Sequence, residues 1–262
     1  MRTALTIAGS DSGGGAGIQA DLKTFAAHGV YGTSAITAIT AQNTRGVTAW
    51  QPVSVKLVVD QIEAVAGDIG ADAVKTGMLA NEAIVTAVAE AVVRLGLRNL
   101  VVDPVMIAKG GDRLLEDAAV DALRSQLIPL AYVVTPNVPE AEVLAGLSIR
   151  SVAEMRDAGR RILELGPRVV LVKGGHLEGS ESIDVMCTEA GVIELRSPRH
   201  DTLHTHGTGC TLASAIAANL ALEKHAEDAI REAKVYVEGA IRHAPGLGSG
   251  HGPLDHFWRG RP

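Results

Sequence analysis

The segment 204–211, His-Thr-His-Gly-Thr-Gly-Cys-Thr, combines a tight glycine turn with a nucleophilic side chain. Gly207 and Gly209 flank Thr208, and neither proline nor glycine occurs in the stretch 210–222 that follows. This pattern predicts a glycine turn leading into a helix over 210–222. Because that helix would be apolar on almost every side, we expect it to be buried.

The start of such a helix is suited to binding an anion. Its free backbone N–H groups converge on one spot, and the helix dipole adds about half a positive charge there. Gly207, Thr208 and Gly209 therefore form a candidate anion site. Cys210 lies near the first turn, where we expect the thiol pKa to fall below its usual value of about 8.5. The alternative is a buried helix with a glycine-rich start and an inert core cysteine.

A second glycine-rich segment, 9–17, reads Gly-Ser-Asp-Ser-Gly-Gly-Gly-Ala-Gly. It is not a P-loop, because no Lys-Ser or Lys-Thr follows the glycines. Residues 15–20 fit the loose dinucleotide fingerprint, but the segment 31–42 contains no acidic residue that could hold a ribose. We interpret the loop as one whose backbone approaches a small substrate at Gly9, with Asp11 accepting a hydrogen bond from a hydroxyl group. A flexible turn is the alternative.

Further polar residues follow predicted strands. Gln42 presents a donor and an acceptor side by side, which complements an aminopyrimidine or a substituted pyridine, although a surface-turn glutamine explains it as well. Asp103, Asn137 and Glu140 offer oxygen ligands that suit Mg²⁺ together with substrate phosphates. Asn137 and Glu140 also have the spacing of a helix-capping box. Lys173 places a cation beside glycines, where a nucleotide phosphate could approach.

The elements that must position these groups alternate along the chain. The apolar patterns predict strands at 4–8, 31–41, 46–53, 73–76, 100–103, 132–135 and 169–172, and a hairpin of 183–187 with 192–195. They predict helices at 18–28, 56–69, 81–95, 118–127, 139–145, 152–165, 210–222 and 227–243. This alternation indicates crossover connections and an α/β fold with a mostly parallel sheet that is covered on both faces.

The carboxyl ends of parallel strands lie at one edge of the sheet, where ligands bind. We therefore expect the polar residues that follow the strands to share one cleft, although loops are polar in any case. These residues are Asp11, Gln42, Thr76, Asp103, Asn137 and Lys173.

Composition restricts the class of protein. The chain has 262 residues, of which 47% are hydrophobic and 21% charged, so a large core is expected, and one domain over 1–262 is the simplest organisation. Aromatic residues make up 3%, the net charge is -6 and no basic run occurs, which disfavours nucleic-acid and acidic-membrane partners.

Cysteine content and apolar patterning bear on the location of the protein in the cell. The two cysteines, Cys187 and Cys210, cannot form a disulfide framework and suit a reducing compartment. The N-terminus lacks a signal-peptide core, and no apolar run approaches the length needed to span a membrane. The expectation is a soluble, cytoplasmic protein.

With these residues in hand, the chain resembles the ribokinase-like superfamily and, within it, the hydroxymethylpyrimidine/phosphomethylpyrimidine kinases of thiamine biosynthesis. The resemblance spans nearly the whole chain. The segments that carry it are 8–23, 41–44, 75–79 (Lys-Thr-Gly-Met-Leu), 103–106 (Asp-Pro-Val-Met), 135–140 (Thr-Pro-Asn-Val-Pro-Glu), 173–176 (Lys-Gly-Gly-His), 205–211 and 248–253.

This resemblance implies a three-layer αβα sandwich and a defined reaction. The family transfers the γ-phosphoryl group of ATP to 4-amino-5-hydroxymethyl-2-methylpyrimidine and then phosphorylates the monophosphate to the diphosphate. It further implies that Gly9, Gln42, Met78 and Val105 hold the pyrimidine. Family members are commonly homodimers.

The resemblance also implies roles at the phosphates. Gly207, Thr208, Gly209 and Cys210 would form the anion hole, with Cys210 where sugar kinases of the superfamily carry a catalytic aspartate. Asp103 and Glu140 would bind Mg²⁺. The residues on the ATP side would be Asn137, Lys173 and His206. Cys210 would accept or orient the proton of the substrate hydroxyl.

One departure and several alternatives remain. His204 stands where relatives often carry Asn or Asp, which puts any potassium dependence in doubt. Pyridoxal kinase is the nearest alternative, on the same fold and with the same chemistry. A non-catalytic pyrimidine sensor and an NAD-dependent oxidoreductase are the others.

Overall fold

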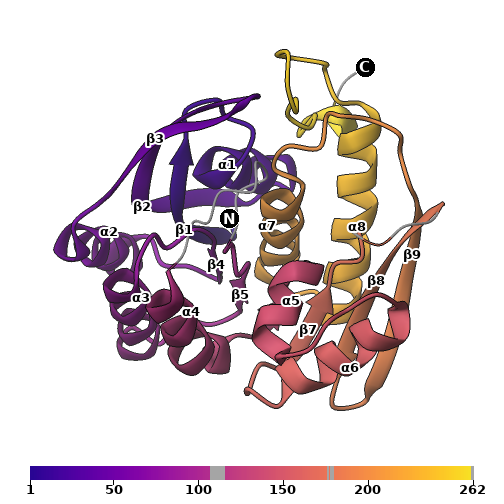
Figure 1. Ribbon diagram of the computed structural model, residues 1–262. Helices are drawn as coiled ribbons and strands as arrows, with labels where there is room; N and C mark the ends of the chain where they lie inside the picture. The colour runs from indigo at the N-terminus through magenta and orange to yellow at the C-terminus, as the bar shows by residue number, and fades with distance from the viewer. Residues whose placement is uncertain (107–115, 176, 178–179, 261–262) are drawn as a thin grey trace.

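The computed structural model describes residues 1–106, 116–175, 177 and 180–260 and shows a nine-stranded sheet between two layers of helices (Figure 1). The strands are β1 (Thr3–Asp11), β2 (Tyr31–Asn43), β3 (Gly46–Pro52), β4 (Ala73–Thr76), β5 (Leu100–Val102), β6 (Val133–Val134), β7 (Val169–Val172), β8 (Glu181–Thr188) and β9 (Gly191–Pro198). Their order in the sheet is β3-β2-β1-β4-β5-β6-β7-β8-β9.

The central strands are parallel and the edges antiparallel. β2, β1, β4, β5, β6 and β7 pair in parallel, whereas β3, β8 and β9 join by antiparallel hairpin pairing. The four residues of β4 and the four of β7 are all buried, as strands covered on both faces must be. The mostly parallel sheet expected from the alternating apolar patterns is confirmed.

Helices cover both faces of the sheet, which confirms the three-layer αβα sandwich. The helices are α1 (Gly17–Ala27), α2 (Val55–Asp68), α3 (Glu82–Arg94), α4 (Asp117–Ala122), α5 (Val138–Ala145), α6 (Val152–Leu163), α7 (Thr208–Ala221) and α8 (Ala226–Arg242). α1, α7 and α8 share one hydrophobic cluster, and α2 to α6 share the other. No helix within the described ranges is both long and apolar enough to cross a bilayer.

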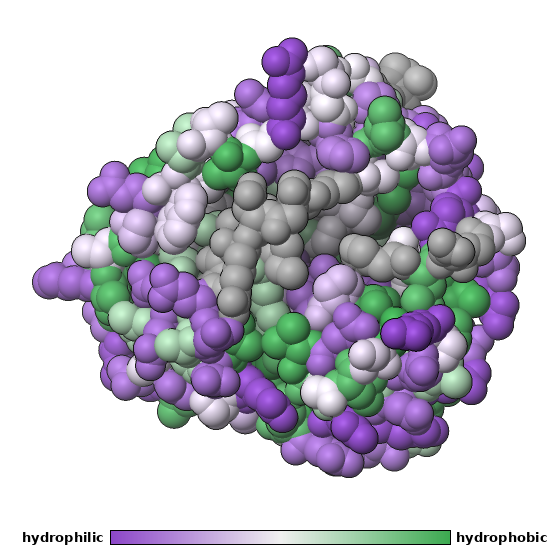
Figure 2. Space-filling view, viewed as in Figure 1, coloured by the Kyte–Doolittle hydropathy of each residue, from purple (hydrophilic) through white to green (hydrophobic). Residues whose placement is uncertain are grey.

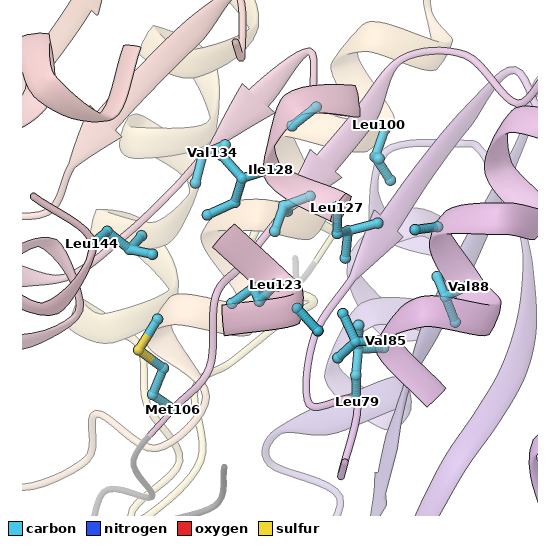
Figure 3. Packing of buried hydrophobic residues seen from close by; sticks show 14 of the residues in the cluster. Leu79, Val85, Val88, Leu100, Met106, Leu123, Leu127, Ile128, Val134 and Leu144 are labelled. Carbon is cyan, nitrogen blue, oxygen red and sulfur yellow. The ribbon is translucent and has the colours of Figure 1, made fainter. Parts of the chain in front are cut away.

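The helix expected over 118–127 is shorter and less regular. α4 ends at Ala122 and continues as a π-helical turn over Leu123–Leu127 and a 3₁₀ turn over Ile128–Leu130. Leu123, Leu127 and Ile128 point into the core among side chains of α3 and the strands (Figure 3). A π-helical turn is wider than an α-helical one, and here its side chains face the core. The spacing of apolar residues in the sequence did not reveal this change of helix type.

α7 is the central helix of its layer, and its position explains its composition. Every residue from 211 to 221 is buried, because the helix packs against α1, α8 and the sheet. Alanine is the commonest residue in this stretch, and its small side chain allows neighbouring elements to approach closely. The space-filling view from the same side shows hydrophilic side chains around the outline of the molecule, with hydrophobic ones scattered between them (Figure 2).

Candidate active site

One cleft of about 1320 Å³ contains the candidate catalytic, binding and metal residues expected from the sequence, whereas Thr76, which was expected at the same edge, is fully buried and does not line it. It lies along the carboxyl ends of the parallel strands and is bordered by the start of α7, as the parallel topology requires. The expected residues that line it are Gly9, Asp11, Gln42, Met78, Asp103, Val105, Asn137, Glu140, Lys173, His206, Gly207, Thr208, Gly209 and Cys210. His176, the last residue of the segment 173–176, lies outside the described residues.

The start of α7 has the geometry of an anion cradle. Gly207 is the N-cap residue, with a left-handed φ of 81°, and it contributes no side-chain hydrogen bond. The Thr208 N–H makes a long bond of 3.4 Å to the Thr205 carbonyl, and the N–H groups of Gly209 and Cys210 remain available to a ligand. A Cβ at position 207 would overlap the carbonyl oxygen of Gly15, so the two glycine-rich segments meet here and glycine is required.

A charged group lies over this cradle. Lys173 Nζ is 2.8 Å from Asp103 Oδ1, and this ion pair is nearly buried. A Cβ at Gly209 would lie 3.2 Å from Lys173 Nζ and 3.6 Å from Asp103 Oδ2. Because position 209 has no side chain, the Lys173 ammonium group can approach the start of α7. The ammonium group and the positive end of the helix dipole both favour the binding of a phosphate there.

Asn137 and Glu140 form a complete capping box at the start of α5. The Asn137 side-chain oxygen accepts from the Glu140 N–H at 2.9 Å, and Glu140 Oε2 accepts from the Asn137 N–H at 2.8 Å. The helix-capping box that the spacing of Asn137 and Glu140 suggested is therefore present. Both residues also line the cleft, so capping orients them without removing them from it.

Glu140 has a strongly perturbed carboxyl group. Burial raises its pKa to about 7, and nearby Asp103 adds to the increase, while Lys173 and the Asn137 N–H oppose it. The cleft thus holds excess negative charge near neutral pH unless Glu140 is protonated or a further cation is bound.

This carboxyl group makes folding stability depend on pH. Between its usual pKa of 4.5 and about 7, Glu140 is deprotonated in the unfolded chain but protonated in the native one. Stability is therefore lost as the pH rises through this window. Urea unfolding at pH 5 and pH 8 should show a smaller loss for Glu140→Gln, which keeps the capping acceptor. Equal losses in both proteins would contradict this assignment.

The lowered thiol pKa expected for Cys210 is wrong for this state of the protein. Burial raises the pKa of Cys210 to about 11, and the carboxylates of Asp21 and Asp103 add to the increase, while Lys75 opposes it. Desolvation outweighs the helix start, although Cys210 is only partly buried and lines the cleft. The thiol is protonated at neutral pH.

The raised pKa can be measured by alkylation. Iodoacetamide should label Cys210 slowly at pH 7, and the rate should keep rising beyond pH 9 without a plateau, because only the thiolate reacts. Peptide mapping distinguishes this label from one on Cys187, which is buried. A plateau below pH 8 would restore the low-pKa interpretation.

The residues expected to hold the pyrimidine all line the cleft. A Cβ at Gly9 would contact Met78 Sδ at 3.4 Å, so the Gly9 backbone and the Met78 thioether lie side by side. Val105 follows β5 and lines the same cleft. Gln42, near the end of β2, lies beside Thr40 and the ring of His206.

Asp11 organises the loop that contains it, in addition to the role expected toward a substrate hydroxyl. Its carboxylate accepts from the N–H groups of Gly13, Gly15 and Ala16 at 2.8, 3.0 and 2.8 Å, and it lies 3.0 Å from His206 Nε2. Three of these donors, from Gly15, Ala16 and His206, use Oδ2, whereas Oδ1 accepts from Gly13 alone and keeps one lone pair for a further donor. Burial raises the pKa of Asp11, but the bonds from His206, Ala16 and Gly13 outweigh it and lower the pKa below its usual value.

His206 also differs from expectation in its surroundings. Its ring lies against Asp11 and Gln42, among the residues assigned to the pyrimidine, and not in the pair formed by Lys173 and Asp103. His204, two residues earlier, has a buried Nδ1 without a hydrogen-bond partner. These positions follow from the loop path before α7, which the sequence does not specify.

Sequence reasoning missed a buried ion pair beneath the cleft. Lys75 on β4 and Asp21 on α1 are both completely buried, and Lys75 Nζ lies 3.0 and 2.9 Å from the two carboxylate oxygens. Ser214 of α7 and Thr6 of β1 donate to the same carboxylate at 2.6 Å each. A lysine within an apolar strand was the available signal, because such a residue requires a partner.

A family model described as phosphomethylpyrimidine kinase matches residues 11–255 of the chain. The thiamine biosynthesis bifunctional protein of Geobacter sulfurreducens is 52% identical over 253 residues, which cover 97% of this chain and 52% of that protein. The chain therefore spans about half the length of that relative. A hydroxymethylpyrimidine/phosphomethylpyrimidine kinase of Bacillus subtilis is 48% identical over 97% of this chain and 94% of its own length.

Solved structures of related kinases share the fold of this chain. The ADP complex of Bacillus subtilis pyridoxal kinase superposes with a TM-score of 0.94 at 39% identity, covering 100% of both chains. Phosphomethylpyrimidine kinase of Clostridium difficile superposes with a TM-score of 0.83 at 47% identity, covering 92% of this chain and 100% of that one.

Proposed function

The chain belongs to the phosphomethylpyrimidine kinase family, and from this premise we propose how its cleft performs the family's reaction. The protein is a phosphotransferase of thiamine biosynthesis that phosphorylates hydroxymethylpyrimidine and then its monophosphate. ATP is the phosphoryl donor, and related kinase structures carry ADP. The observation that carries the site assignment is the anion cradle of α7 with the Lys173 ammonium group above it.

Phosphoryl transfer requires alignment and charge neutralisation more than covalent chemistry. The pyrimidine is held by Gly9, Gln42, Met78 and Val105, with its hydroxymethyl arm toward the cradle. The N–H groups of the first turn of α7 stabilise charge on the transferred group, since they already point at one spot. Lys173 and Asn137 lie on the phosphate side of the cleft and bind the polyphosphate of ATP.

The donor set fits Mg²⁺. Asp103 and Glu140 supply two carboxylates, and Mg²⁺ in kinase sites takes one or two carboxylates with substrate phosphates and water. Burial is the main cause of the raised pKa of Glu140 and the nearby Asp103 carboxylate adds to it, so a divalent cation would favour the charged form of both carboxyl groups. Within the described ranges no group of three His, Cys, Asp or Glu residues is placed to bind a metal by itself. Bound Mg²⁺ would neutralise phosphate charge.

Cys210 is proposed to orient the proton of the hydroxyl arm rather than remove it. A thiol with a pKa of about 11 is a poor base at neutral pH, and a loose transition state requires little base assistance. Cys210→Ala should therefore lower kcat strongly while leaving pyrimidine affinity similar. An unchanged kcat would leave the cradle alone responsible for catalysis.

Mass spectrometry of the products tests the whole assignment. Incubation with ATP, Mg²⁺ and hydroxymethylpyrimidine should yield the monophosphate first and the diphosphate later, with two equivalents of ADP. Formation of no phosphorylated product would reject the function, and a monophosphate alone would reject the second step. Binding without ADP formation would instead support a pyrimidine sensor.

Pyridoxal phosphorylation is the second candidate, because pyridoxal kinase of Bacillus subtilis shares the fold at a TM-score of 0.94. The same assay with pyridoxal in place of the pyrimidine compares the two. We expect the pyrimidine to have the higher kcat/KM. A clear preference for pyridoxal would reverse the order.

The assembly proposed is a homodimer through the β2–β3 edge of the sheet. β3 is an edge strand whose residues 48–52 are all exposed, and Ile39 and Trp50 expose 60% and 43% of their surfaces there. Exposed strand edges with apolar side chains favour pairing with another chain. Sedimentation velocity should show twice the chain mass.

A cytoplasmic location is also proposed, because both cysteines are free thiols.

A further inference from the structure

Four polar side chains form a continuous network beside the cleft. His206 Nε2 lies 3.0 Å from Asp11 Oδ2 and 3.3 Å from the side-chain amide of Gln42. The other end of that amide lies 3.1 Å from Thr40 Oγ1. Thr40 Oγ1 in turn lies 2.8 Å from the carbonyl oxygen of Ser10.

Donors and acceptors in this network admit one consistent assignment. The Asp11 carboxylate only accepts hydrogen bonds, so His206 Nε2 carries a proton that it donates to Asp11. The single hydroxyl proton of Thr40 goes to the closer acceptor, the carbonyl of Ser10. Thr40 Oγ1 can therefore only accept from Gln42.

These two ends determine the orientation of the Gln42 amide. In the structure the Gln42 amide nitrogen faces His206 Nε2 at 3.3 Å and its oxygen faces Thr40, so two N–H donors oppose each other at His206. The opposite orientation removes this conflict, because the amide nitrogen then donates to Thr40 and the oxygen shares the single Nε2 proton of His206 with Asp11 in a three-centre hydrogen bond. An amide is nearly symmetric in shape, so hydrogen bonding and not packing decides its orientation.

We propose that Asp11 and His206 are positioning residues that fix the Gln42 amide with its oxygen toward α7, and thereby select a ring with an amino group next to the reacting arm. The proposal rests on the proposed function, in which Gln42 binds the pyrimidine. It assigns a specificity role to His206, whose ring is largely buried.

The order of atoms along the Gln42 edge matches that of the substrate. His206 directly precedes Gly207, so the oxygen end of the amide is the end nearer the cradle. In 4-amino-5-hydroxymethyl-2-methylpyrimidine the amino group neighbours the reacting arm, and the ring nitrogen N3 is one atom further. With the arm at the cradle, the amino group donates to the Gln42 oxygen and N3 accepts from its nitrogen. The reversed amide would place donor against donor.

Ligand pairs test this selectivity. The probes are hydroxymethylpyrimidine and its analogue without the 4-amino group, with dissociation constants measured by calorimetry. The wild-type protein should prefer the amino compound, and His206→Leu should reduce that preference about tenfold, the loss expected for one well-placed hydrogen bond. His206→Gln should restore most of it, because its amide N–H₂ can donate to both Asp11 and Gln42.

A matched control isolates the effect. His225→Gln changes an exposed histidine at the start of α8 and should leave the preference unchanged. If His206→Leu weakens both ligands equally, or His206→Gln fails to restore the preference while remaining folded, the positioning role is refuted.

The protonation of His206 is tested independently of any ligand. Nitrogen-15 NMR of the free protein at pH 7.5 to 8 should show the His206 proton on Nε2, and a proton on Nδ1 alone would refute the network. If the wild-type protein binds neither pyrimidine, the proposed function and the selectivity fail together. The Nε2 proton would then still decide whether the network exists.

Discussion

Gly207→Ala should reduce kcat by about 10²–10³, the cost of losing one oriented donor at a developing anion. The residue has a φ of 81°, and an added Cβ would overlap the Gly15 carbonyl oxygen. The helix start must therefore move, and its N–H groups would no longer converge on one spot. Single-turnover kinetics with saturating ATP and pyrimidine would measure this loss directly.

Gly29→Ala is the matched control for Gly207→Ala. Gly29 also has a left-handed φ, of 71°, but an added Cβ there would meet nothing within 4 Å. Both variants carry the same backbone strain of roughly 1 kcal/mol, and only Gly207→Ala disturbs the cradle. Equal kcat values in the two variants would show that the position of the cradle does not limit turnover.

Lys173→Met should lower kcat/KM for ATP by about three orders of magnitude, since the cation lies over the helix start where the phosphates are proposed to bind. The variant also leaves Asp103, 2% exposed, without its ion-pair partner. Removing one member of a buried pair costs about 3–5 kcal/mol of stability. Kinetics and unfolding must therefore be measured together.

A double variant separates these two effects of Lys173. Lys173→Met with Asp103→Asn removes the unpaired buried charge and should recover stability but not activity. Lys56→Met, which breaks an exposed pair with Asp60, should change neither. If the double variant regained kcat/KM, the loss in the single variant would be a folding defect rather than a missing phosphate contact.

Helices and strands could be predicted from the sequence where a local pattern of residues was sufficient to specify them. The glycine turn before an uninterrupted apolar stretch predicted α7 within two residues of its start at Thr208. Apolar runs that end in polar residues predicted the parallel sheet and the edge at which the site lies. The π-helical turn at Leu123–Leu127 could not be predicted from the sequence. The direction of its side chains depends on their packing against α3 and the strands.

Charge states required the tertiary structure. The helix-start rule lowers a thiol pKa, yet Cys210 has a pKa of about 11, because burial among distant segments outweighs the local dipole. Asp11 accepts bonds from the N–H groups of its own loop and from His206, and the bond from His206 joins residues far apart in the sequence, so the sequence did not reveal it. The Lys75–Asp21 pair joins residues 54 positions apart, so neither residue identifies the other.

The sequence by itself determined which residues come together, because crossover connections place all carboxyl strand ends at one edge of a parallel sheet. It also predicted the tight glycine turn before α7, since backbone conformation is a local property. Only the tertiary structure decided what each side chain does in the cleft. Desolvation, ion pairing and the sharing of hydrogen bonds depend on neighbours from several elements, and these made Asp11 and His206 organisers of the site and left Cys210 protonated.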